Sequence, residues 1–295
     1  MADTASQAPA IFGSDAYSPA EIQDKVEKLG IKKAHMPFLP ELVLSIVAGG
    51  SIGLGAMFYF IIMGDPTLGY AAQRVLGGVA FSLGLILVMI AGAELFTGNC
   101  LIVMAWANRQ IRTGEVLKNW TLVWIGNFIG GLGVVFLLTM CHFASLNGGN
   151  VGLGILKTAV GKLSPDFTTI FFKGIMCNLL VCLAVWLSYA GRSVADKIIG
   201  MVMPVTAFVA VGFEHCVANM IFLPLAWVIV AMGGAPAGFD ASVITIPAIV
   251  HNLVPATLGN IVGGAGFVGV IYWLIYRKGL GGITPLPKAT TVPAE

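Results

Sequence analysis

Four acidic or basic residues lie away from the ends of strongly apolar stretches of this sequence, and their chemistry needs an explanation. They are Glu94, Lys173, Glu214 and His215. An ionisable group costs several kcal/mol in a membrane interior, so each is a functional candidate by default. Histidine gains or loses a proton near neutral pH, which makes His215 the candidate for proton transfer. The competing interpretation is a neutral histidine whose ring is satisfied by one hydrogen bond.

Three of these residues belong to a motif that occurs twice. The segments GAELFTGN (92–99) and GFEHCVAN (212–219) both contain a glycine, a glutamate two residues later and an asparagine five residues after that. Irregular backbone inside a membrane must line a cavity or be buried in protein. Thr97 in the first motif offers a hydroxyl that could reach His215 in the second.

A second pair of motifs follows in the same order. GNFIGG (126–131) lies in the third apolar stretch, and GNIVGG (259–264) lies in the sixth. Together the motifs define a repeat of three stretches. Because three is odd, the second half enters the membrane from the opposite side. Matched helix breaks in two inverted halves indicate a pathway near the membrane midplane.

The two glutamates occupy equivalent positions of the repeat. Two carboxylates facing a pore would repel anions, so a structural role is favoured over contact with a permeant species. We expect Glu94 and Glu214 to bind backbone N–H groups freed at the breaks, or the amides of Asn127 and Asn260. The asparagines that end the two motifs, Asn99 and Asn219, are expected to bind freed backbone groups in the same way.

The composition indicates lipid as the solvent of this chain. Of its 295 residues, 57% are hydrophobic and 10% are charged, and the mean hydropathy is +0.90. A soluble globular protein is about 25% charged. The net charge of +2 gives no sign of nucleic-acid binding. No H-E-x-x-H, G-x-S-x-G or Walker motif is present, so we expect neither an enzyme nor a metal or cofactor site.

Six long apolar stretches carry the motifs. They lie near 40–63, 74–107, 119–141, 168–190, 198–232 and 249–276. The second and fifth run to about 34 residues, roughly 50 Å as a straight helix, against a hydrocarbon core of about 30 Å. We therefore predict an all-α integral membrane protein with six transmembrane helices in two inverted three-helix repeats, of which spans 2 and 5 are discontinuous.

Lysine and arginine gather on one set of connections, while the other set holds only Arg74, Lys157 and Lys162. The positive-inside rule then places both termini in the cytoplasm. Three regions follow: a cytoplasmic segment 1–36, a transmembrane domain 37–278 and a cytoplasmic tail 279–295. A capping-box sequence and apolar spacing predict an amphipathic helix at 19–33, as an interface anchor or as a gate.

These motifs resemble the formate–nitrite transporter family. The resemblance rests on GAELFTGN, GFEHCVAN and GNIVGG, together with FKGIMCNLLVCLAVW (172–186). It covers about residues 19–280. The stretch NLLVCLAVWLSYAGRS (178–193) is most similar to the formate-channel branch.

The resemblance implies an aquaporin-like protomer in a homopentamer, with a pore in each subunit, in a prokaryotic inner membrane. It implies that His215 is the central pore histidine, that Thr97 is its partner, and that Glu214 and Asn178 support the pair. It also implies a pore role for Asn260 and an anion-attracting role for Lys162 at the periplasmic entrance. The implied constrictions are Phe81, Leu85 and Phe208 on the periplasmic side, and Leu95, Phe96 and Val181 on the cytoplasmic side.

The function expected from the resemblance is passive, pH-sensitive conduction of small weak-acid anions, formate first. A protonated His215 would pass its proton to formate, and neutral formic acid would cross the second constriction without the dehydration cost of an anion. In a competing mechanism, His215 stays charged and only lowers the electrostatic barrier. The chain could instead carry nitrite or hydrosulfide, act as a proton-coupled secondary transporter, or serve as a receptor or scaffold.

Overall fold

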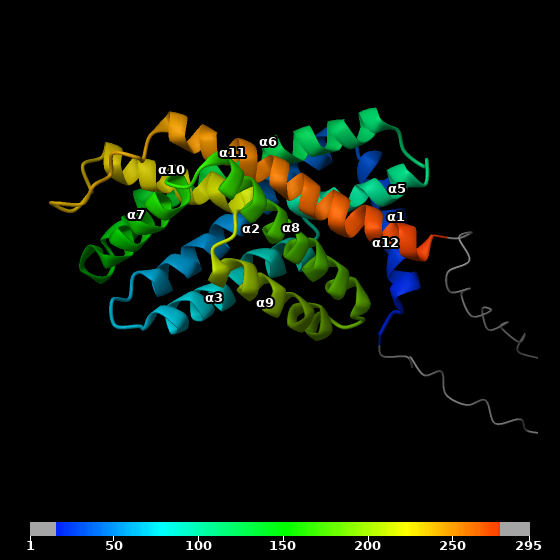
Figure 1. Cartoon of the computed structure of the whole chain (residues 1–295), viewed down its shortest axis with the longest axis horizontal. Coiled ribbons are helices and arrows are strands. Elements are labelled where there is room, and N and C mark those ends of the chain that lie inside the picture. Colours follow the sequence, from blue (N-terminus) through cyan, green and yellow to red (C-terminus); the bar gives the residue numbers. More distant parts are fainter. Residues whose placement is uncertain (1–15, 278–295) are drawn as a thin grey trace, which may run out of the picture.

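The computed structural model describes residues 16–277, and the regular secondary structure of this part of the chain is helical apart from one isolated β-bridge (Figure 1). The predicted C-terminal tail at 279–295 lies outside the described residues. Among residues 16–277, six helices are long and apolar enough to cross a membrane. Large apolar side chains remain exposed along these helices. That exposure suits a protein whose outer surface faces lipid.

The described helices divide into two halves. The first half holds α1 (Pro19–Ala34), α2 (Phe38–Met63), α3 (Tyr70–Ala91), α4 (Phe96–Asn99), η1 (Cys100–Ile102), α5 (Val103–Ala107) and α6 (Thr113–Met140). Two short turns, η2 (Phe143–Ser145) and η3 (Asn147–Gly149), connect the halves. The second half holds α7 (Asn150–Leu163), α8 (Phe167–Ala190), α9 (Val194–Val211), α10 (Cys216–Ala231), α11 (Ile246–Ile261), the π-helix η4 (Val262–Val270) and α12 (Ile271–Tyr276).

Two helix breaks lie where the repeated motif begins. Helix α3 ends before Gly92, whose φ is 81°, and α9 ends before Gly212, whose φ is 80°. Glycine adopts this left-handed conformation without steric cost, so it ends a helix and redirects the chain. The chain is then non-helical through residue 95 in the first half and residue 215 in the second, before α4 and α10 begin.

The two halves repeat one arrangement of four elements. Helix α2 packs against α3 and α6, and α8 packs against α9 and α11. After each break, the glutamate N–H donates to a carbonyl of the half's first long helix, Glu94 to Leu44 at 3.2 Å and Glu214 to Lys173 at 3.4 Å. A shorter helix precedes the first long helix in each half, α1 before α2 and α7 before α8. The sequence did not predict α7, because its glycines and lysines interrupt the apolar run.

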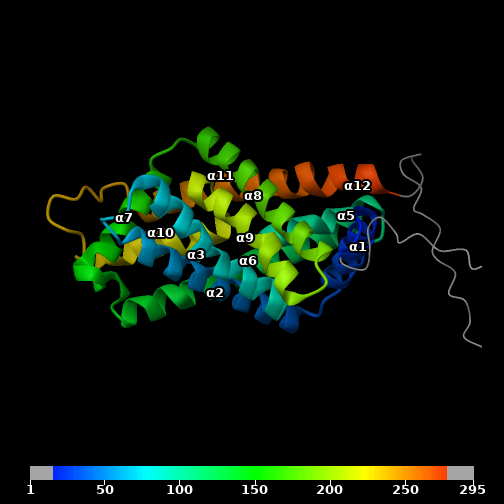
Figure 2. The ribbon, with the colours of Figure 1, turned by 90° about the horizontal axis from the view of Figure 1, so that it is seen from below.

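Helix α1 begins at a complete capping box. The Glu21 carboxylate accepts from the Ser18 N–H at 2.8 Å, and the Ser18 hydroxyl accepts from the Glu21 N–H at 3.4 Å. These bonds from Ser18 lower the pKa of Glu21. Helices α1 and α12 lie at the same end of the molecule, and α7 lies at the other end, in both views (Figures 1 and 2). The two halves therefore present their short first helices to opposite ends.

Candidate pore site at the two helix breaks

The two breaks bring His215 and Thr97 together. The Nε2 atom of His215 lies 3.1 Å from the Thr97 hydroxyl, although 118 residues separate them in sequence. Both side chains are buried. His215 is the N-cap of α10 and Thr97 lies in the first turn of α4, so each half contributes one member of the pair.

The hydrogen bonds of His215 define its tautomer. Its Nδ1 atom accepts the N–H of Ala218 at 2.9 Å and caps α10. An accepting Nδ1 carries no proton, so the neutral ring carries its proton on Nε2 and donates it to the Thr97 hydroxyl. A doubly protonated ring would have to give up the bond from Ala218. In this geometry His215 is a neutral hydrogen-bond donor.

Asn260 of α11 holds the break before α10. Its Oδ1 accepts the Cys216 N–H at 2.9 Å, and its Nδ2 donates to the carbonyls of Glu214 and Gly174, both at 2.8 Å. A helix break leaves backbone donors and acceptors without partners, and burying them unpaired is costly. One side-chain amide therefore satisfies three buried backbone groups.

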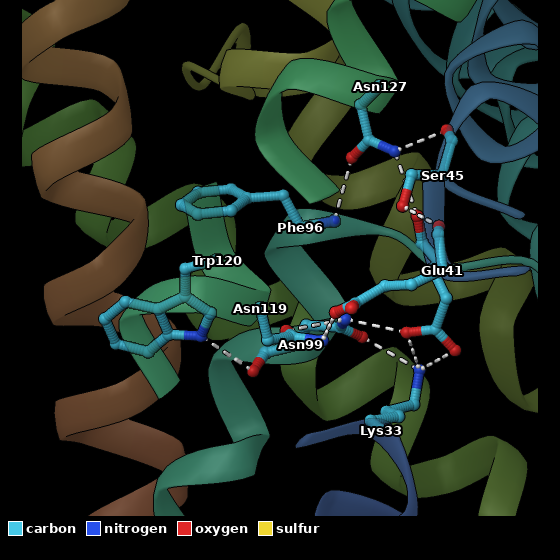
Figure 3. Close-up of polar contacts among 9 residues, drawn as sticks. Lys33, Glu41, Ser45, Phe96, Asn99, Asn119, Trp120 and Asn127 are labelled. Atoms are coloured by element: carbon cyan, nitrogen blue, oxygen red, sulfur yellow. Dashed lines mark hydrogen bonds and ion pairs between the residues drawn. The ribbon is translucent and has the colours of Figure 1, made fainter. Parts of the chain in front are cut away.

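Asn127 of α6 performs the same task in the first half. Its Oδ1 accepts the Phe96 N–H at 2.9 Å, and its Nδ2 donates to the carbonyls of Glu94 at 2.9 Å and Ser45 at 2.8 Å (Figure 3). The two asparagines come from the repeated GN dipeptide. The repeat found in the sequence is thus reproduced by hydrogen bonds in the structure.

Asn178 of α8 supports the Thr97 side of the pair. Its Nδ2 donates to the Thr97 carbonyl at 3.2 Å and to the Asn260 carbonyl at 2.7 Å. It therefore ties α4 to α11 behind the pair and touches the backbone of Thr97, not its hydroxyl.

The predicted partners of Glu214 were wrong. Its carboxylate accepts from Lys162 Nζ at 3.1 Å, from Asn219 Nδ2 at 2.6 Å and from Asn252 Nδ2 at 3.4 Å. Neither a freed N–H nor the amide of Asn260 reaches it, because that amide is occupied by the backbone of the break. A buried carboxylate needs charged or multiple hydrogen-bonded partners, and Lys162 with the two asparagines meets that need. Asn219 was expected to bind freed backbone groups, and this prediction was also wrong, because its amide donates to the Glu214 carboxylate.

The prediction for Glu94 was wrong in the same way. Its carboxylate accepts from Lys33 Nζ at 2.8 and 2.9 Å and from Asn99 Nδ2 at 2.7 Å. The Asn99 amide also donates to Asn119 at 3.1 Å, so it binds side chains and not the freed backbone groups that we expected. Lys33 of α1 and Lys162 of α7 therefore occupy equivalent places in the two halves.

The first half carries one carboxylate that the second lacks. Glu41 of α2 is buried, accepts from Asn119 Nδ2 at 2.7 Å and lies 3.7 Å from Lys118 Nζ. The carbonyls that bind the breaks, Ser45 and Gly174, set the register between α2 and α8. In that register the counterpart of Glu41 is Ile170, which is apolar.

A cavity of about 300 Å³ opens on the α7 side of the pair, and we call it the α7 vestibule. Its lining includes Arg74, Lys157, Lys162, Lys173, Phe208 and His215. Phe208 stacks on the His215 ring at 5.8 Å between centroids, and Phe81 meets Phe208 edge-on at 6.1 Å. Both phenylalanines therefore form an apolar border beside the histidine. Both were predicted at a constriction.

A pocket of about 30 Å³ lies on the α1 side, and we call it the α1 pocket. Lys33, Leu85, Leu95 and Asn99 are among its lining residues. Leu85 was predicted with Phe81 and Phe208, yet it lines this pocket together with Leu95. Because the α1 pocket is lined by the residues around Thr97 and the α7 vestibule by His215, the pair lies between the two cavities.

Two further predicted constriction residues line neither cavity. The Phe96 ring packs edge-on against Trp120, with centroids 6.4 Å apart. Val181 is buried in the main apolar core. Phe96 lies outside both cavities because it is the first residue of α4. Its N–H donates to Asn127 of α6, and its ring turns toward the same helix.

Lys33, Asn119 and Asn252 are site residues that sequence reasoning missed. A signal for the asparagines was present, because Asn119 and Asn252 each lie eight residues before the asparagine of a GN motif. This is about two helical turns, so both residues share one face of their helix.

Helix α1 is packed onto the end of the molecule that holds the α1 pocket. Ile22 and Val26 are buried. Two cations contact the Tyr17 ring, Lys25 at 4.8 Å and Arg192 at 4.2 Å from its centroid. Burial lowers the pKa of Lys25, and neighbouring cations lower it further.

Comparison with known proteins agrees with this architecture. The family model described as "Formate/nitrite transporter" matches residues 20–274. The chain is 41% identical over 274 residues to "Formate channel FocA" of Escherichia coli (strain K12), covering 90% of this chain and 96% of that protein. It is 35% identical over 284 residues to "Probable formate transporter" of Methanothermobacter thermautotrophicus, covering 90% and 100%.

Two solved structures share the fold. "Pentameric formate channel with formate bound" is 41% identical, with a TM-score of 0.73 over 82% of this chain and 98% of that chain. "FNT family ion channel" is 29% identical, with a TM-score of 0.76 over 86% and 98%. The repeated motifs, the paired breaks and these similarities lead to one conclusion: the chain belongs to the formate/nitrite transporter family.

Proposed function

We propose that this protein is a passive, pH-sensitive channel for small monovalent weak-acid anions, with formate as its main cargo, and that it is not an enzyme. The observation that carries the proposal is the buried His215–Thr97 pair, 3.1 Å apart between two cavities. The relatives named above as formate channels support the choice of cargo.

The physical problem for such a channel is dehydration. A bare anion loses its hydration in a narrow apolar passage, whereas a neutral molecule loses far less. The cations of the α7 vestibule attract an anion, and Lys162, which is bound to Glu214, is one of them. Beyond the vestibule, Phe81 and Phe208 make the passage apolar. A hydrogen-bond donor at His215 is then placed where an anion needs one.

Proton transfer at His215 would remove the charge altogether. In this step an N–H bond of the imidazolium breaks, an O–H bond forms on formate, and a neutral ring and formic acid remain. The imidazolium form requires Nδ1 to release the Ala218 N–H. We propose that the ring leaves its cap to take up a proton and returns to it after donation. Thr97 and Asn178 orient Nε2, and Asn260 holds the break.

The assembly we propose is a homopentamer in a prokaryotic inner membrane, with a pore in each protomer. Both described ends of the chain lie at one end of the molecule (Figures 1 and 2). Lysine and arginine cluster on the connections at that end, so we propose that the termini face the cytoplasm. The α1 pocket then faces the cytoplasm and the α7 vestibule faces the periplasm.

Reconstitution into liposomes tests the function. We expect formate flux to exceed chloride flux at every pH and to rise as the pH falls. Nitrite and hydrosulfide, measured in parallel, decide the cargo. Linear concentration dependence without counterflow is expected for a channel, while saturation at low turnover with counterflow would identify a secondary transporter. Absence of flux for all four anions would contradict the proposal and favour a receptor or scaffold.

A further inference from the structure

The α7 vestibule is far more cationic than the conduction of one monovalent anion requires. Four cationic side chains face one carboxylate in its lining, so three positive charges are in excess. They are Arg74, Lys157, Lys162 and Lys173, and the carboxylate is Glu214. Like charges repel, so this grouping is costly unless an anion occupies the cavity.

Two of these cations are fixed on the same stretch of backbone. Arg74 Nε donates to the Ala210 carbonyl at 2.7 Å, and Lys162 Nζ reaches the Phe213 carbonyl at 3.4 Å. Both carbonyls belong to the chain around the second break. Lys173 joins them from α8, where its own carbonyl binds the Glu214 N–H at 3.4 Å. The charges thus come from separate elements that converge on one cavity.

The α1 pocket lacks this excess of positive charge. The α1 pocket contains one cation, Lys33, which is bound to Glu94 at 2.8 Å. Glu41 is connected to this network through Asn119. Lys118 lies 3.7 Å from Glu41, so two lysines face two carboxylates and the fixed charge of this network is balanced. The two cavities therefore differ in charge, even though equivalent elements of the repeat build them.

The apolar border formed by Phe81 and Phe208 limits which anions can pass from the α7 vestibule toward His215. Phe81 and Phe208 pack edge-on with centroids 6.1 Å apart, and Phe208 stacks on His215. A doubly charged oxyanion gains twice the Coulomb energy of a monovalent anion from the vestibule cations. It also loses far more on dehydration at the border.

We propose that the α7 vestibule is a binding site for a small divalent oxyanion of the sulfate type, which occupies the mouth and blocks conduction from that side only. The blocking role rests on the proposed anion flux, whereas the binding site does not. Lys157 and Lys173 supply the charge that distinguishes a divalent from a monovalent ligand.

The test uses sulfate as the probe and the full chain as the protein. Equilibrium dialysis of radiolabelled sulfate against detergent-purified protein measures binding at constant ionic strength. We expect Lys157→Met and Lys173→Met each to weaken sulfate binding about tenfold and chloride binding about threefold, because the Coulomb energy scales with ligand charge. Lys28→Met, which removes an exposed lysine of α1, should change neither.

Flux measurements test the block. Sulfate added at the α7 side of oriented proteoliposomes should lower formate flux, and sulfate added at the α1 side should leave it unchanged. Equal block from both sides, sulfate binding no tighter than chloride binding, or equal losses in Lys28→Met and Lys173→Met would each overturn the proposal. Absence of formate flux without sulfate would instead refute the proposed function, and the dialysis result would still decide the binding site.

Discussion

The substitution Asn260→Ala tests whether one amide holds the second helix break. The wild-type side chain is buried and makes three hydrogen bonds, one to a backbone N–H at 2.9 Å and two to backbone carbonyls at 2.8 Å. Alanine leaves all three backbone groups buried without these partners. Each orphaned group costs about 1–3 kcal/mol, so the three together predict a loss of about 3–9 kcal/mol in the free energy of unfolding.

The assay is reversible unfolding of the purified protein in mixed micelles by titration with a denaturing detergent. Asn127→Ala provides the matched variant, because its amide makes three equivalent bonds in the first half. The two losses should agree within about 1 kcal/mol, the usual scatter for one kind of interaction. Gln110→Ala removes an exposed side chain and should stay within about 0.5 kcal/mol of the wild type.

A loss below about 1 kcal/mol in Asn260→Ala would refute this reasoning. It would mean that water, or a rearranged backbone, satisfies the three groups as well as the amide does. A large loss in Asn260→Ala with none in Asn127→Ala would refute the equivalence of the two breaks, while leaving the role of Asn260 itself intact.

Three further predictions concern other parts of the fold. Gly130→Ala should lower the thermal midpoint sharply, because its Cβ would overlap a backbone carbonyl of α2, whereas Gly133→Ala meets open space and should be neutral or stabilising. Hydrogen bonds from the residue that caps α1 lower the pKa of Glu21. The resulting stabilisation is present above the unfolded pKa and is lost as the pH falls through the folded pKa. The hydrogen-exchange protection factors of α1 should therefore fall below about pH 4, and they should fall less in Glu21→Gln. Lys162→Met leaves the buried Glu214 carboxylate without its cation and should cost about 3–5 kcal/mol in the free energy of unfolding. Adding Glu214→Gln should recover part of that loss. Strictly additive losses in the double variant would contradict the pairing.

The parts of the site that the sequence predicted are those built from a repeated local pattern. The glycine that ends α3 recurs before α10, and each can be found because positive φ selects glycine. The GN asparagines recur in the same order, so their equivalence was visible without a structure. His215 and Thr97 could be paired because inversion of the second half brings its break to face the first.

The contacts that the sequence did not predict depend on which of several possible partners each side chain binds in the folded protein. Glu94 and Glu214 could have bound backbone groups at the breaks, but the amides of Asn127 and Asn260 bind those groups instead. The lysines of α1 and α7 bind the two carboxylates. Helix α7 was missed because lysines and glycines interrupt its apolar face. Phe96 was expected in the pore, yet its ring packs on α6. Tertiary geometry decides each of these outcomes.

The central claim is that His215 handles the proton that accompanies a small weak-acid anion. Simultaneous measurement of electrical current and proton uptake during formate flux in proteoliposomes tests it, with His215→Asn compared with the wild type. Asparagine can still cap α10 but cannot titrate, so the helix break should be retained. We expect the wild type to move protons with formate and His215→Asn to lose that coupling. Unchanged coupling of protons to formate in His215→Asn would contradict the claim.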